Sequence, residues 1–239
     1  MKVTDIIIPV ESPWTLKRFG PRHDCGYVVA VTPEFLKLKA LYGYGVGTNV
    51  QFESEVIAET GAKGYLFDHT VDALYENNVI FKPQKGTAES ILRHLHENDH
   101  YNRYLPMLLK MDIEGDEWDI FDHALPALLN FHQICVEVHH LTVKPLEEML
   151  RILNKLFSYY HLVHLHANNY GTVKDGVPNT LEFTLVERSV FDCVPVQQRK
   201  PLPFIGLDYP NNTKLPDITL DWWLPKQVEQ CYAHPPCCN

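Results

Sequence analysis

The chain has 239 residues, of which 45% are hydrophobic and 21% are charged, and its formal net charge at pH 7 is −9. This length and composition suit one globular α/β domain with extensions. The negative charge argues against a nucleic-acid partner, because proteins that bind phosphate backbones usually present a basic face. The opening apolar run of about five residues is too short for a signal sequence or a membrane span. We therefore expect no membrane span and a cytoplasmic location.

Residues 1–38 form a predicted N-terminal extension built around a polar turn. Thr32 is followed by a proline, a pattern that predicts the cap and first position of a short helix. Two interpretations of the extension stay open. It packs over the sheet as a lid, or its residues Arg18, Asp24 and Tyr27 close over a bound cofactor.

From residue 40 onward, apolar strand-like runs alternate with amphipathic helical segments, as in a parallel sheet with helices on both faces. The predicted strands cover residues 40–44, 64–68, 78–82, 107–112, 133–139, 160–166 and 181–187. The last strand follows a turn instead of a helix, so we expect it to lie antiparallel beside the sixth. The prediction is a Rossmann-like class I methyltransferase fold over residues 39–190, with a seven-stranded, mostly parallel sheet.

Residues 191–239 are rich in proline and aromatic side chains and show no periodicity. We expect them to wrap the domain as an extended segment whose last residues are disordered. Cys231, Cys237 and Cys238 lie near His234. Their spacing is not that of a common zinc finger, so a disordered tail is preferred over a zinc site.

The segment at residues 41–68 has the outline of a cofactor-binding unit: a strand, a glycine-containing turn, a helix and a second strand ending in an acid. Glycines let the backbone approach a ligand closely, and an acid about 20 residues later can reach a ribose hydroxyl. The third glycine of the dinucleotide motif is missing, so the pattern fits S-adenosylmethionine (SAM) better than NAD(P). The predicted cofactor contacts are Tyr44, Gly45, Gly47, Asn49 and Asp68, with Asp24 from the extension.

Acidic and imidazole side chains gather at the ends of the fourth and fifth predicted strands. Asp112 ends one strand, and period-two alternation places Glu137 and His139 on one side of the next. Together they could hold Mg²⁺ or Mn²⁺. Such an ion would bind two vicinal hydroxyls of a substrate and lower the pKa of the one to be methylated. The alternative, that Asp112 only caps the following helix, stays equally open.

The sequence HLHANNYG ends the sixth predicted strand with an imidazole and two amides. Ligands of such sheets bind at the carboxyl ends of the strands. His166 is therefore a candidate general base, and Asn168 and Asn169 are candidate contacts to a sugar. The alternative is a simple turn beside a rim histidine whose hydrogen bonds are internal.

Five blocks of the sequence, in order, resemble one known family. KMDIEGDEWDIF (110–121) looks like the K-x-D-x-E-G-x-E motif of FkbM-type (methyltransferase-21-like) methyltransferases. KRFGPRHDCGYVV (17–29) resembles a segment that precedes the domain in a related branch, with Cys25 where a glycine is usual. YGVGTNVQFE resembles the SAM motif of that branch, and HLHANNYG with PNTLEFT, then PLPFIGLDYPNN, resemble its closing blocks.

The resemblance implies SAM-dependent O-methylation, with sugars or polyketide hydroxyls as substrate classes. By match, the two glycines of the turn and Asp68 would line the SAM site, and Asp112 would stand at the catalytic end of its strand. In the last block, Asp208 and Tyr209 are expected to contact the acceptor.

The leading hypothesis is a SAM-dependent O-methyltransferase that acts on a sugar hydroxyl, free or within a glycan. Asp112, His139 and His166 are the candidates for its general base or metal ligands. A rival is a catalytically inactive module of the same fold that binds a glycan or a protein partner. An NAD(P)-dependent sugar enzyme is a weaker third hypothesis.

Overall fold

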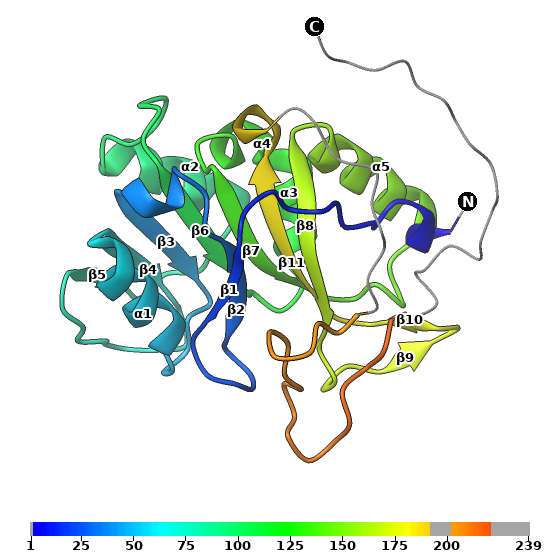
Figure 1. Ribbon diagram of the computed structural model, residues 1–239. Helices are drawn as coiled ribbons and strands as arrows, with labels where there is room; N and C mark the ends of the chain where they lie inside the picture. The colour runs from blue at the N-terminus through cyan, green and yellow to red at the C-terminus, as the bar shows by residue number, and fades with distance from the viewer. Residues whose placement is uncertain (1, 192–201, 221–239) are drawn as a thin grey trace, which may run out of the picture.

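The computed structural model describes residues 2–191 and 202–220, and its centre is one seven-stranded sheet (Figure 1). The strand order is β5-β4-β3-β6-β7-β11-β8. The bounds are β3 Ala40–Tyr44, β4 Lys63–Phe67, β5 Val79–Lys82, β6 Met107–Met111, β7 Gln133–Val138, β8 Tyr160–Ala167 and β11 Leu181–Glu187. Pairs from β5 to β7 are parallel, whereas β11 runs antiparallel between β7 and β8. The predicted class I methyltransferase fold is confirmed.

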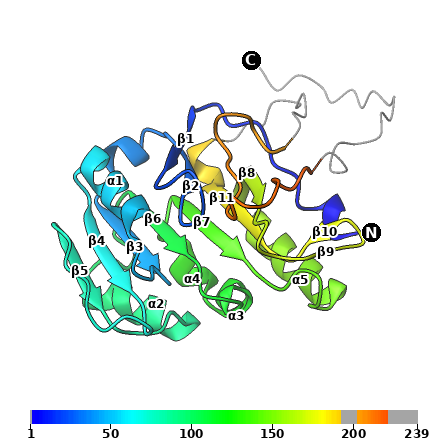
Figure 2. The same cartoon turned by 90° about the horizontal axis from the view of Figure 1, so that it is seen from below.

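Helix α1 covers one face of the sheet, and α2 to α5 cover the other (Figure 2). The bounds are α1 Gln51–Thr60, α2 Ala88–Glu97, α3 Glu117–His123, α4 Leu125–Leu128 and α5 Leu146–Phe157. The larger apolar core lies on the second face, where Tyr42 of the sheet joins Leu95 of α2 and Phe121 of α3. Helix α2 begins where Thr87 accepts a hydrogen bond from the backbone amide of Ser90, because such a cap satisfies an otherwise unpaired donor.

The face that carries α1 is completed by an N-terminal hairpin (Figure 2). The hairpin strands are β1 Leu16–Phe19 and β2 Tyr27–Ala30. Gln133 exchanges hydrogen bonds with the backbone of Ala30, and the side chains of Cys135 and Thr184 both donate to the carbonyl of Val28. Buried polar groups need hydrogen-bond partners. The hairpin backbone provides these partners for the polar side chains of β7 and β11. An apolar helix packed in its place would leave those side chains without hydrogen bonds.

The short elements are η1 Val3–Asp5, η2 Phe35–Lys37, η3 Arg188–Val190, β9 Val173–Lys174 and β10 Val177–Pro178. The helix predicted after Thr32 is the single turn η2, and the Phe35 amide at its start donates a hydrogen bond to the Thr32 hydroxyl. No helix of the described residues is both long and apolar enough to cross a membrane.

Residues 202–220, hereafter the C-terminal loop, lie at the carboxyl end of the parallel strands beside the turn of the hairpin (Figure 1). Backbone and side-chain bonds join Asp24 of the hairpin to Asn211 of the loop. The domain boundaries at residues 39 and 190 stay predictions. The cysteine-rich tail for which a disordered end was predicted lies outside the described residues.

Candidate active site

The turn between β3 and α1 forms the first wall of the site. Gly45 and Gly47 have φ values of +68° and +56°, a backbone conformation that glycine adopts without steric cost. A Cβ on Gly45 would overlap the carbonyl oxygen of Asp112, while one on Gly47 would meet nothing within 4 Å. The first glycine therefore allows two strand ends to pack together, and the second borders open space.

Asp68 follows β4 and holds this turn in place. One carboxylate oxygen accepts the Gly47 amide at 2.8 Å, and the other accepts the amide and hydroxyl of Thr70 at 2.7 and 2.6 Å. Burial raises the pKa of Asp68, but these hydrogen bonds outweigh it and leave the pKa below its ordinary value. A carboxylate accepts about four hydrogen bonds, so one acceptor position remains for a ligand hydroxyl.

The structure places the other predicted cofactor contacts differently. Tyr44 points into the core, where its hydroxyl lies 3.0 Å from Nδ1 of His94. It cannot contact a ligand through its side chain, which corrects that prediction. Asn49 accepts the amide of Gln51 at the start of α1. The observed partner of Asp24 is the C-terminal loop.

Asp112 follows β6, and one of its carboxylate oxygens is fixed by buried neighbours. The hydroxyl of Tyr27 donates to Oδ2 at 3.0 Å, and Nζ of Lys110 lies 3.7 Å from the same oxygen. Lys110 also donates to the carbonyl of Gly45 at 2.7 Å. Burial alone would lower the pKa of Lys110, but attraction to Asp112 and Glu53 outweighs burial and raises it. Among the described residues, no donor bonds to Oδ1 of Asp112, so this oxygen can accept a substrate proton.

His139 follows β7 and is surrounded by carboxylates. Its Nδ1 lies 3.0 Å from Glu117, and its Nε2 lies 3.3 Å from Glu137, 3.5 Å from Glu114 and 4.0 Å from Asp112. Burial lowers the pKa of His139, but the hydrogen bonds to Glu117 and Glu137 outweigh it and raise the pKa to about 10. An imidazole that is protonated at neutral pH is a poor general base. The geometry therefore argues against that role.

The candidate metal site keeps two of its three predicted ligands. Ligand atoms of Asp112, Glu114 and His139 lie within 4.8 Å of one another. Glu137 is instead buried and accepts a hydrogen bond from Asn168 at 2.8 Å. Carboxylates suit Mn²⁺ and Mg²⁺, while the imidazole favours a transition metal, so this donor set fits Mn²⁺ better than Mg²⁺. The structure thus favours Glu114 as the third ligand and makes Glu137 a support for Asn168.

Glu117 is a functional candidate to which the sequence analysis gave no role, although it lies in the strand-end block after Asp112. It is fully buried at the start of α3, where it accepts the amide of Ile113 at 3.0 Å and faces Nδ1 of His139. A carboxylate behind an imidazole fixes the orientation of the other ring nitrogen. Trp118 donates to the carbonyl of His139 at 2.7 Å, so α3 holds both ring and backbone. The signal was present in the K-x-D-x-E-G-x-E block, in which both Lys110 and Glu117 are motif positions.

His166 lies at the end of β8 but is only 1% exposed. Its Nδ1 is 3.1 Å from Glu182, and its Nε2 is 3.1 Å from Asp217 of the C-terminal loop. Burial lowers the pKa of His166, but attraction to Glu182 and the hydrogen bond to Asp217 outweigh it and raise the pKa to about 10. A protonated ring with both nitrogens engaged cannot take a substrate proton. The predicted general base is therefore replaced by a clamp on the C-terminal loop.

Two of the four predicted acceptor contacts also hold this loop, whereas Asn168 donates to Glu137. Asn169 donates to carbonyls of Asn212 and Pro216, and Asp208 is buried with its carboxylate 2.9 Å from Nε2 of His164. Tyr209 differs from Asn169 and Asp208 because it stays partly exposed. Its contact with an acceptor stays a prediction.

The turn of the hairpin is held rigidly over this end of the sheet. Arg18 donates to the carbonyls of Pro21 and His23 at 3.0 and 2.8 Å. Cys25 adopts φ +67°, the left-handed conformation for which glycine is the usual residue. A Cβ on Gly26 would overlap the carbonyl oxygen of Pro21. The extension is therefore a packed cover on this face of the sheet.

Comparison with known proteins gives no matching family model and no matching curated protein. The similar solved structures include fibrillarin in complex with Nop5p, with 12% identity, 64% of this chain and 73% of that chain covered, and a TM-score of 0.43. Another is the Methanococcus jannaschii fibrillarin pre-rRNA processing protein, with 8% identity, 64% and 68% coverage, and a TM-score of 0.38. A third, described as a hemolysin of Streptococcus thermophilus, has 13% identity, 66% coverage of each chain and a TM-score of 0.36. The resemblance to FkbM-type methyltransferases therefore rests on the sequence blocks alone.

Proposed function

We propose that the chain is a SAM-dependent O-methyltransferase acting on a hydroxyl of a sugar, free or within a glycan. The observation that carries this proposal is the arrangement of two neighbouring strand ends. One bears the glycine turn pinned by Asp68, and the other bears Asp112 with a carboxylate oxygen left unbonded by the described residues. Ligands of doubly wound sheets bind at this end of the strands.

The residues around the glycine turn fit SAM. The remaining acceptor position of Asp68 suits a ribose hydroxyl, and the space beside Gly47 is open to a ligand. At the start of α1, Asn49 accepts the Gln51 amide and Val50 makes no side-chain cap, so the other amides of the first turn and the helix dipole can attract the carboxylate of the amino-acid part. When bound, SAM supplies the methyl group and a sulfide leaving group.

Asp112 is the proposed general base, because its free oxygen can take the proton of the acceptor hydroxyl. Tyr27 and Lys110 hold the other oxygen and so fix the direction of the free one. The protonated ring of His139 lies beside it and would stabilise negative charge that develops on the acceptor oxygen. The chain thereby aligns the hydroxyl and receives its proton, which are its two tasks in methyl transfer.

A metal-dependent version uses the same residues but needs the His139 ring to give up its proton, because an imidazole ligand must be neutral. Asp112, Glu114 and His139 would hold Mg²⁺ or Mn²⁺, with Glu117 behind the imidazole. The ion would supply charge that lowers the pKa of a bound hydroxyl. Calorimetric titration with Mn²⁺ separates the two versions. Loss of the Mn²⁺ binding heat in Glu114→Gln supports the metal site. Unchanged methyl transfer after EDTA treatment rejects the metal-dependent version.

The proposal is tested by calorimetry with SAM and its demethylated product, followed by transfer of a labelled methyl group to a panel of sugars. Binding of both cofactor forms and labelling of a sugar support it. Absence of heat with either form refutes the cofactor site. Binding without transfer to any acceptor would favour the rival, an inactive module of this fold.

A further inference from the structure

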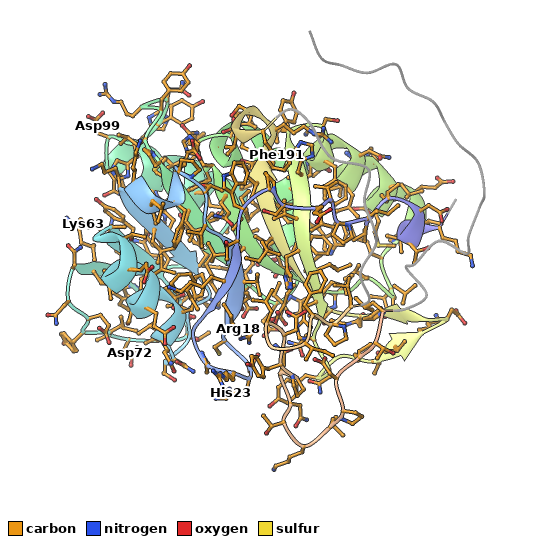
Figure 3. The ribbon with its side chains drawn as sticks, viewed as in Figure 1. Arg18, His23, Lys63, Asp72, Asp99 and Phe191 are labelled. Carbon is orange, nitrogen blue, oxygen red and sulfur yellow. The ribbon has the colours of Figure 1, made fainter. Side chains whose placement is uncertain are left out.

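A groove of about 310 Å³ lies between the hairpin and the C-terminal loop. Its polar and aromatic lining comes from Lys17, Arg18, Arg22 and Tyr209. Figure 3 shows Arg18 on the side of the hairpin that faces the loop. Three cationic side chains thus meet at one place in a chain whose net charge is −9.

Arg22 is an exposed cation of the groove, and the partly buried Arg18 lies beside it. Lys17 pairs with Glu59 at 3.0 Å, but within the described ranges neither Arg18 nor Arg22 forms an ion pair with a carboxylate. Their guanidinium groups lie 5.6 and 5.4 Å from the ring centre of Tyr209. Nη1 of Arg18 is buried and has no hydrogen-bond partner in the described part of the chain. Two donor groups therefore flank one aromatic face.

The walls of the groove are fixed before any ligand arrives. Asn211 of the C-terminal loop donates to Glu182 at 2.7 Å and to Asp24 of the hairpin at 3.3 Å. The Nε and Nη2 atoms of Arg18 are held by backbone carbonyls of the hairpin turn. A site whose side chains are already ordered loses less entropy when it binds a ligand.

We propose that this groove binds the phosphate of a phosphorylated sugar, the acceptor of the methyl transfer proposed above, on which this inference rests. Guanidinium groups bind phosphate through paired, charge-assisted hydrogen bonds. The face of Tyr209 suits the apolar face of a sugar ring. Arg18 lies opposite Val28 in the hairpin register, one residue from Tyr27, which reaches Asp112. The same hairpin therefore contributes residues to the groove and to the surroundings of the proposed base.

The test is calorimetric titration of the full chain with glucose 6-phosphate, glucose and inorganic phosphate. Arg22→Gln removes an exposed charge of the groove, and Arg103→Gln is the matched control because Arg103 pairs with Asp99, far from Arg18 in Figure 3. Glucose 6-phosphate should bind more tightly than glucose. Arg22→Gln should weaken it about tenfold, and Arg103→Gln should leave it unchanged. Tyr209→Ala should weaken the binding of glucose 6-phosphate because it removes the aromatic ring. Tyr209→Phe keeps the ring and should bind glucose 6-phosphate as tightly as the wild type.

Equal affinity of wild type and Arg22→Gln for glucose 6-phosphate would overturn the proposal, as would no preference over glucose. An RNA oligonucleotide that binds more tightly than glucose 6-phosphate and is lost in Arg22→Gln would assign the groove to nucleic acid instead, and would also overturn it. SAM is titrated into the same samples. If the chain binds glucose 6-phosphate but not SAM, the groove is a sugar phosphate site and the methyltransferase proposal fails.

Discussion

Removing the charge of His166 should change how the stability of the protein depends on pH. The folded pKa is about 10, against an ordinary value of 6.5. Because the folded pKa is raised, the stabilisation is complete below pH 6.5 and is lost as the pH rises through 10. A shift of this size corresponds to an upper bound of about 5 kcal/mol at 1.36 kcal/mol per pKa unit. We expect the wild-type free energy of unfolding to fall between pH 7 and 10.

The matched variant is His166→Gln combined with Glu182→Gln. The single change would leave Glu182 buried without its cation, which costs about 3–5 kcal/mol. The double change removes both buried charges and leaves only Asp217, which is partly exposed. Urea unfolding followed by circular dichroism, from pH 6.5 to 10, should give a flatter profile for the double variant. His123→Gln is the control, since His123 is exposed beside Asp119. Parallel profiles of wild type and double variant would refute the clamp.

Three further changes test the proposed chemistry and the backbone. Asp112→Asn should lower kcat by about 10²–10⁴ without changing SAM affinity, and kinetics that retain half the activity would contradict its role as base. Asp68→Ala removes the hydrogen bonds to Gly47 and Thr70, so calorimetry should show SAM binding at least about tenfold weaker; unchanged affinity would place SAM elsewhere. Cys25→Gly relieves a left-handed backbone conformation and should raise the free energy of unfolding by about 0.5–1 kcal/mol. The gain is expected because the strain of the left-handed conformation exceeds the entropy that glycine adds to the unfolded state. A decrease in the free energy of unfolding, measured by urea titration, would contradict this.

The strands of the sheet were predictable because each is a short run of mostly apolar residues, continuous or alternating with polar ones, bounded by turns. The antiparallel place of β11 followed from the turn that replaces a helix before it. The sequence did not predict that the hairpin packs over β7 and β11. Its bonds from Val28 and Ala30 reach residues more than 100 positions away, and local pattern carries no information about such pairing.

The candidate site was predictable in its position and less so in its roles. The rule that ligands bind at strand ends identified Asp112, His139 and His166 together. It could not show that His166 meets Glu182 and Asp217, which lie 16 and 51 residues away. Whether a strand-end histidine accepts protons depends on the charges beside it, and those charges come from distant segments.

The block KMDIEGDEW begins at the end of strand β6 and ends in helix α3. The spacing of its polar residues follows from this change from strand to helix. Lys110 and Asp112 are two residues apart across the end of β6, so both side chains point to the hairpin face, where they meet. The chain then turns through Glu114 and Gly115, at φ +60° and +116°, and a Cβ on Gly115 would clash with the ring of His140. This close passage brings the first turn of α3 beneath the end of β7, where Glu117 meets the imidazole. The block thus joins a base on one strand to a charged ring on the next through a turn that only a residue without a side chain can make.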